Sequence, residues 1–123
     1  MTTNLLSRLA PCPRTPNCVS TLAPRGRQHM EPIPYTGARE AARQRLLSVL
    51  RGMERTKVVA ETEDSLHAEC RSLIFRFVDD VEMVLDDKAK LIHFRSASRI
   101  GRSDYGVNRK RMEEIRRAFL AQR

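Results

Sequence analysis

Tryptophan is absent from this 123-residue chain, and aromatic residues as a whole are scarce, with two tyrosines and four phenylalanines. These few rings do not alternate with basic residues as they do where side chains stack on nucleic-acid bases. Long apolar runs are also missing. No stretch approaches the ~20 residues that a transmembrane helix requires, and no continuous apolar stretch of signal-peptide length opens the chain. The sequence therefore predicts a single soluble, cytoplasmic domain with no membrane span.

Cysteine is sparse, and proline is confined to one part of the chain. Three cysteines do not make a disulfide framework, and no second cysteine pair or nearby histidine pair completes a zinc site. Cys12 and Cys18 share a proline-stiffened loop, P-C-P-R-T-P-N-C, and a disulfide between them is one open hypothesis. All six prolines fall within residues 1–35, and proline disfavours both helices and central strands. We therefore expect residues 1–35 to form an irregular N-terminal arm and residues 36–123 to form the folded domain.

Charge is unevenly distributed along the chain. The formal net charge is +8, with 23 lysines and arginines against 15 aspartates and glutamates. Residues 57–94 carry nine acidic and five basic side chains, whereas residues 95–123 carry nine basic and three acidic ones. Such a basic surface favours an anionic partner, for example a phosphate-bearing ligand or a nucleic acid. The alternative is a solvated basic face with no partner.

Hydrophobic periodicity predicts two helices with antiparallel strands between them. Apolar residues at helical spacing predict helices over residues 36–54, with Thr36 as the N-cap, and over residues 108–122. Alternation of apolar and polar residues predicts strands over residues 57–62, 66–72, 73–78, 81–86 and 90–95. The pair Asp79–Asp80 is expected in a turn, and residues 96–107 are expected in a loop. The fold class is therefore α+β: a single antiparallel sheet of about four to five strands, two amphipathic helices packed on one face, and an irregular Pro-rich arm.

The stretch from Arg95 to Arg111 holds the candidate site. It reads R-S-A-S-R-I-G-R-S-D-Y-G-V-N-R-K-R, with six basic residues and three serines. Its last three residues fall in the first turn of the second predicted helix, where positive charge opposes the helix dipole and a bound anion would offset it. The segment therefore predicts an anion-binding or partner-docking site. The candidate binding residues are Arg95, Ser96, Ser98, Arg99, Ser103, Asp104, Asn108, Arg109 and Arg111.

Three acidic residues, Asp79, Asp80 and Glu82, keep other interpretations open. They are expected to form ion pairs with basic residues of the segment, namely Arg95, Arg99 and Arg109. Such ion pairs would either orient the binding residues or serve only to hold the segment against the sheet. Together with Asp104 the three acidic residues would alternatively serve a carboxylate- or metal-dependent hydrolase. A non-specific nucleic-acid-binding accessory protein is a further alternative. No acid–base spacing or nucleophile motif identifies a catalytic residue, so we expect a non-enzymatic protein with no cofactor or metal, whose partner is a small anion or another protein.

Three motifs give the chain a family resemblance: C-P-R-T-P-N-C-V-S at residues 12–20, R-S-L-I-F-R-F-V-D-D-V-E at 71–82 and the segment at 95–111. On these residues the chain resembles the family known as domain of unknown function 1499, found in bacteria and photosynthetic eukaryotes. The resemblance implies a shared fold and a shared polar site, but no particular reaction. Many members look exported, lipid-anchored or organellar, whereas no leader is recognised in this sequence.

Overall fold

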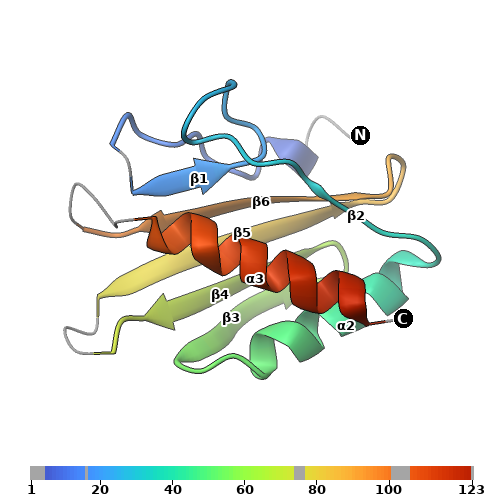
Figure 1. The fold of residues 1–123 in the computed structure, drawn as a ribbon. Helices are drawn as coiled ribbons and strands as arrows, with labels where there is room; N and C mark the ends of the chain where they lie inside the picture. Colours follow the sequence, from blue (N-terminus) through green and yellow to red (C-terminus); the bar gives the residue numbers. More distant parts are fainter. Residues whose placement is uncertain (1–4, 16, 74–76, 101–105, 123) are drawn as a thin grey trace.

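The computed structural model describes residues 5–15, 17–73, 77–100 and 106–122 (Figure 1). In these residues the fold is α+β, with two helices and one antiparallel sheet of six strands. The elements in chain order are β1 (Cys18–Ser20), β2 (Ile33–Pro34), α2 (Arg39–Arg51), β3 (Thr56–Thr62), β4 (Ser65–Arg71), β5 (Val78–Asp86), β6 (Leu91–Ser98) and α3 (Val107–Ala121). Neither of the helices described here has the length and apolar character needed to cross a membrane.

The four long strands form an antiparallel meander, and two short strands extend it. The strand order is β1-β6-β5-β4-β3, and β2 pairs with β6 beside β1. Cys18 pairs with Ala97 and Ile33 with Ile92, so both short strands lie along the same edge of β6. Because all neighbouring strands are antiparallel, β4 and β6 end, and β5 begins, at one end of the sheet, where α3 also begins (Figure 1).

The strands place apolar side chains on one face of the sheet, and both helices cover that face (Figure 1). Alternate residues of β4, β5 and β6 point toward the helices because side chains alternate across a strand. Along α3 the buried residues recur at helical spacing and meet the buried face of α2. The fully buried side chains include Leu46, Leu50, Val81, Leu85, Ile92, Phe94, Met112 and Ile115. The two helices and one antiparallel sheet predicted from the sequence are therefore confirmed.

The N-terminal arm contains more regular structure than its prolines predicted. Its short strands β1 and β2 raise the strand number to six, above the four to five expected. Both strands pair only at the sheet edge, where Pro34, which has no amide donor, is tolerated. The expectation of a wholly irregular arm is therefore not confirmed.

Four local predictions were wrong. The strand expected over residues 73–78 is not found in their described part, because Leu73 lies in a turn and β5 begins only at Val78; residues 74–76 lie outside the described residues. Asp79 and Asp80 lie within β5 and not in a turn, because both pair in register with β4 and β6. Residues 96–98 belong to β6, which runs further than the expected loop boundary. Helix α2 begins three residues after Thr36: its N-cap is Ala38, and no side chain caps it.

The opposite face of the sheet is charged, and the chain start covers one part of it. Leu5 and Leu9 pack against Val84, which points away from the helices. Arg8 forms an ion pair with Asp64 at 2.8 Å, which fixes the same segment beside the turn between β3 and β4. The two faces of the sheet therefore present different chemistry: apolar under the helices and ionic on the other side.

Candidate functional site

The segment from Arg95 to Arg111 is divided among three environments. Residues 95–98 complete β6, Arg99 and Ile100 follow it, and residues 106–111 form the N-cap and first turn of α3. Gly106 is the N-cap with φ of 80°, a left-handed conformation that favours glycine. Two of the predicted binding residues, Ser103 and Asp104, lie outside the described residues. The remaining predicted residues fall on both faces of the sheet.

On the ionic face, Arg99 crosses two strands. Its guanidinium contacts both carboxylate oxygens of Asp80 at 2.7 and 3.0 Å, and it reaches Glu69 on β4 at 2.7 Å. His67 lies 2.8 Å from Asp80 on the other side. Hydrogen bonds from Arg99, and secondarily from His67, hold the pKa of Asp80 below its ordinary value. These pairs orient Arg99 across the sheet surface.

Arg95 lies on the same face within β6, four residues before Arg99 and opposite Glu82 of β5. Its Nη1 contacts Glu82 on β5 at 3.4 Å. Its Nε is buried and makes no hydrogen bond with any residue that the structure describes. Arg95 therefore has one weak ionic partner, in contrast to the bidentate contact of Arg99.

Under the helices, Arg111 and Asp79 form a nearly buried ion pair. The distance between Nη2 and the carboxylate is 2.8 Å, and the two side chains are 13% and 10% exposed. Arg111 reaches Asp79 from the first turn of α3, because Asp79 faces the helices whereas Asp80 faces away. The pair joins α3 to the start of β5.

Asn108 lies beside this ion pair, and its fully buried side chain forms several hydrogen bonds. Its carbonyl oxygen accepts hydrogen bonds from the Ser96 hydroxyl at 2.6 Å and from Arg111 at 3.0 Å. Its amide nitrogen donates to the Ser98 hydroxyl at 3.1 Å and to the main-chain carbonyl of Asn17 at 3.2 Å. One side chain thus connects α3, β6 and the N-terminal arm.

The Arg109 side chain links α3 to the N-terminal arm by hydrogen bonds. It donates to the main-chain carbonyls of Arg27 and His29 at 2.5 and 2.9 Å. Two turns further along, Arg116 donates to the carbonyls of Glu31 and Pro32. These bonds use main-chain acceptors, so no acidic partner in the sequence could have indicated them.

The four carboxylates of the hydrolase hypothesis do not form one described cluster. Asp79 faces the helices, whereas Asp80 and Glu82 face the opposite side of the sheet and contact Arg99 and Arg95. Asp104 lies outside the described part of the chain. Within that part, no group of three or more histidine, cysteine or acidic side chains is arranged to hold a metal ion.

A basic pocket of about 430 Å³ opens at the end of the sheet where α3 begins. Its four cations come from three places: Arg55 precedes β3, Arg71 ends β4, and Lys110 and Arg111 lie on α3. Glu54 and Glu114 also line it. Neither Arg55 nor Lys110 makes a side-chain hydrogen bond or ion pair with another described residue, whereas Arg111 is held by Asp79.

Sequence reasoning missed Arg55, Arg71 and Lys110 as members of a common site. The pocket brings them together only because α2 ends, and β4 ends, beside the start of α3. Arg55 also has φ of 55°, an uncommon conformation for a residue other than glycine, at the turn between α2 and β3. No local pattern in the sequence indicates either feature.

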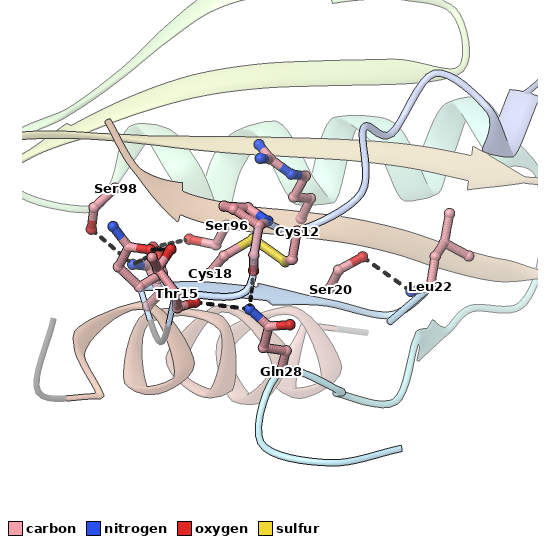
Figure 2. Close-up of a disulfide and its surroundings, with 12 residues drawn as sticks. Cys12, Thr15, Cys18, Ser20, Leu22, Gln28, Ser96 and Ser98 are labelled. Atoms are coloured by element: carbon pink, nitrogen blue, oxygen red, sulfur yellow. Dashed lines mark hydrogen bonds between the residues drawn. A yellow bond between two sulfur atoms is a disulfide. The ribbon is translucent and has the colours of Figure 1, made fainter. Parts of the chain in front are cut away.

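The structure joins Cys12 and Cys18 by a disulfide, with 5.7 Å between their Cα atoms (Figure 2). Cys18 begins β1, so the bond ties the preceding loop to the sheet edge. Gln28 reinforces the same loop by donating to the carbonyls of Pro13 and Thr15 at 2.6 and 2.8 Å (Figure 2). Cys70 is a free cysteine and is buried.

Replacing Cys12 by serine is expected to lower the free energy of unfolding by about 2 kcal/mol, because the bond closes a short loop and constrains the unfolded chain. Urea unfolding with and without reductant measures the change. Reductant should destabilise the wild-type protein and leave Cys12→Ser unaffected. Equal stability of the wild-type protein in both conditions would contradict a structural role for the disulfide.

Comparison with known proteins places the chain in a family of unsettled role. No curated protein and no solved structure matches it. A family model does match, over residues 8–119, and this range includes the disulfide loop, all six strands and most of α3. The polar residues around Asn108 and the basic pocket lie within the matched range. The chain therefore belongs to the family described as protein of unknown function (DUF1499).

Proposed function

We propose that this chain is a non-enzymatic binding domain whose Arg95–Arg111 segment contributes to an anion-binding site. The observation that carries the proposal is the basic pocket, in which Arg55 and Lys110 have no carboxylate partner among the described residues. The segment supplies Lys110 and Arg111 to this pocket. Arg99 and Arg109, which the sequence also favoured, are held by other parts of the protein and serve to position the segment.

An anion in this pocket would give ionic partners to cations that have none among the described residues. Of the four cations that line the pocket, Arg111 is paired with Asp79 and Arg71 contacts Glu69 at 3.4 Å. Arg55 and Lys110 remain, and neither is ion-paired with the two carboxylates of the lining or with another described residue. The first turn of α3 contains no acidic residue to offset the helix dipole. A phosphate group matches this set because guanidinium groups bind its oxygens in pairs and lysine adds a mobile point charge.

The two rival functions receive less support from the geometry. A carboxylate-dependent hydrolase needs its carboxylates to converge, and Asp79 and Asp80 point to opposite faces of the sheet. A nucleic-acid-binding protein needs one continuous basic face. On α3, Arg109 and Arg116 instead bind the carbonyls of the arm.

Titration with inorganic phosphate and pyrophosphate tests the proposal, with chloride at equal ionic strength as the reference. We expect either anion to raise the melting temperature of the wild-type protein, and the rise to disappear in Arg55→Gln/Lys110→Gln. The matched control is Lys88→Gln, an exposed lysine in the β5–β6 hairpin whose side chain also has no partner among described residues. It should retain the full response.

A response that is equal in the pocket variant and in Lys88→Gln would reject the pocket as the anion site. A response to an oligonucleotide, with none to phosphate or pyrophosphate, would instead favour the nucleic-acid alternative. Neither result depends on knowing the natural ligand.

The disulfide indicates the redox state of the compartment in which the protein acts. Disulfides persist in oxidising compartments and are rare in the reducing cytoplasm. The Cys12–Cys18 bond therefore supports an oxidising compartment over the cytoplasmic location predicted from the sequence. The mass of the alkylated protein, isolated from its own cells without reductant, distinguishes the two locations.

A further inference from the structure

Large apolar side chains are exposed at the end of the sheet that carries the basic pocket. Seven such side chains are exposed in the described part of the chain, and four of them gather on the connections around this end. The four are Leu73 at 69%, Ile100 at 60%, Phe77 at 48% and Val107 at 45% exposed. Solvent exposure of four large apolar residues at one end is unusual for a surface that contacts only water.

Main-chain hydrogen bonds show that these residues are neighbours. The Ser72 amide donates to the Phe77 carbonyl at 2.9 Å, which closes the connection between β4 and β5. The Arg99 amide donates to the Val78 carbonyl at 3.0 Å, which places the residues after β6 beside those before β5. Val107 opens α3 at the same end of the sheet (Figure 1).

One of the four apolar residues lies among charged side chains. Val107 itself lines the basic pocket, together with Arg55, Arg71 and Lys110. All three of these cations are exposed. This end of the protein therefore presents apolar side chains and positive charge together.

We propose that this end docks on the surface of an anionic lipid membrane. The apolar side chains would enter the interfacial layer of the bilayer, and the pocket cations would bind headgroup phosphates. The inference deepens the proposed function, on which it rests, by naming a lipid headgroup as the anion. Combined apolar contact and attraction to anionic lipid is how proteins that do not span a bilayer bind its surface.

A membrane fits this surface better than a protein partner does. The core of a protein–protein interface is depleted of charge and buries a continuous patch of roughly 800 Å² on each side. Here the apolar side chains stand on two connections and at the start of α3, and Val107 lies beside arginine and lysine in the basic pocket. Long basic side chains suit a lipid surface because their aliphatic stems lie along apolar groups while their charges remain at the headgroups.

Vesicle flotation of the full chain tests the inference. We expect binding to vesicles of phosphatidylcholine mixed with phosphatidylglycerol, and little binding to phosphatidylcholine alone. Leu73→Ser/Phe77→Ser should weaken the partition about tenfold, because the apolar contact is lost. The matched control, Leu22→Ser, removes an exposed leucine (41% exposed) that follows β1 away from this end, and it should bind as the wild-type protein does. Thermal melting confirms that each variant is folded.

Three outcomes would contradict the inference. The first would overturn the apolar contact, the second would overturn the membrane as the source of the anion, and the third would overturn both the membrane inference and the anion site. If Leu73→Ser/Phe77→Ser binds vesicles as tightly as the wild-type protein while Arg55→Gln/Lys110→Gln does not bind, the contact is purely ionic. If phosphate stabilises the protein and no vesicle binds, the anion is not a membrane lipid. Equal binding to both vesicle types, with no response to phosphate, would reject the proposed anion site as well.

Discussion

Replacing Asp79 by alanine is expected to destabilise the protein by about 3–5 kcal/mol, because the change leaves the nearly buried guanidinium of Arg111 without its counter-charge. Urea unfolding, monitored by circular dichroism, measures this loss. The neighbouring residue supplies a matched control. Asp80 pairs with Arg99, whose side chain is 47% exposed, so Asp80→Ala should cost no more than about 1 kcal/mol.

A second variant separates the charge effect from loss of packing. In Asp79→Leu/Arg111→Met both partners become apolar, and the unfolding free energy should recover most of the loss seen in Asp79→Ala. Similar losses for Asp79→Ala and Asp80→Ala would contradict the different burial of the two pairs. No recovery in the double variant would show that the hydrogen bond to Asn108, and not the ion pair, is what Arg111 contributes.

Replacing Asn108 by alanine is expected to cost roughly 2–4 kcal/mol, since each buried polar group left unpaired costs about 1–3 kcal/mol. The groups affected are the hydroxyls of Ser96 and Ser98, the Asn17 carbonyl and one donor of Arg111. The loss would appear despite the higher helix propensity of alanine, which favours the variant by about 0.5 kcal/mol. Urea unfolding is again the measurement.

The control for Asn108 is Arg117→Ala, at an exposed position of α3 whose side chain has no partner among described residues. Its stability should stay within about 0.5 kcal/mol of the wild-type value. Asn108→Asp keeps the acceptor for Ser96 and Arg111 but loses the donor to Asn17, so it should fall between alanine and the wild type. A loss below about 1 kcal/mol for Asn108→Ala would show that water replaces the lost bonds.

Secondary structure was largely predictable because the core residues follow simple periods. Val81, Met83 and Leu85 alternate, and Met112, Ile115 and Phe119 recur at helical spacing, so strand β5 and helix α3 were recognisable. The prolines misled the prediction for the arm, because a sheet edge accepts a short strand that a central position would exclude. Asp79 and Asp80 misled it too, since paired aspartates are typical of turns.

The site was predictable only in part, because its partners depend on which face each side chain occupies. Charge alone suggested that Asp79, Asp80 and Glu82 pair with basic residues of the segment, without assigning partners. The structure assigns two of them, because Asp80 pairs with Arg99 and Glu82 with Arg95. Charge also suggested Arg109 as an acidic residue's partner, whereas Arg111 pairs with Asp79 and Arg109 binds main-chain carbonyls. A shift of one residue along a strand or helix changes the face on which a side chain lies, and therefore its partner. Composition does not predict such a shift.

The arrangement of β1 and β2 on β6 constrains how the chain folds during synthesis. Residue 18 pairs with residue 97, so the arm leaves the ribosome long before its strand partner exists. The arm cannot dock until β6 has formed, and this closure spans most of the chain length. The arm is synthesised before the sheet and is therefore among the last parts of this domain to become ordered. Until then the disulfide loop and the unpaired edge of β6 are accessible to other chains and to folding enzymes.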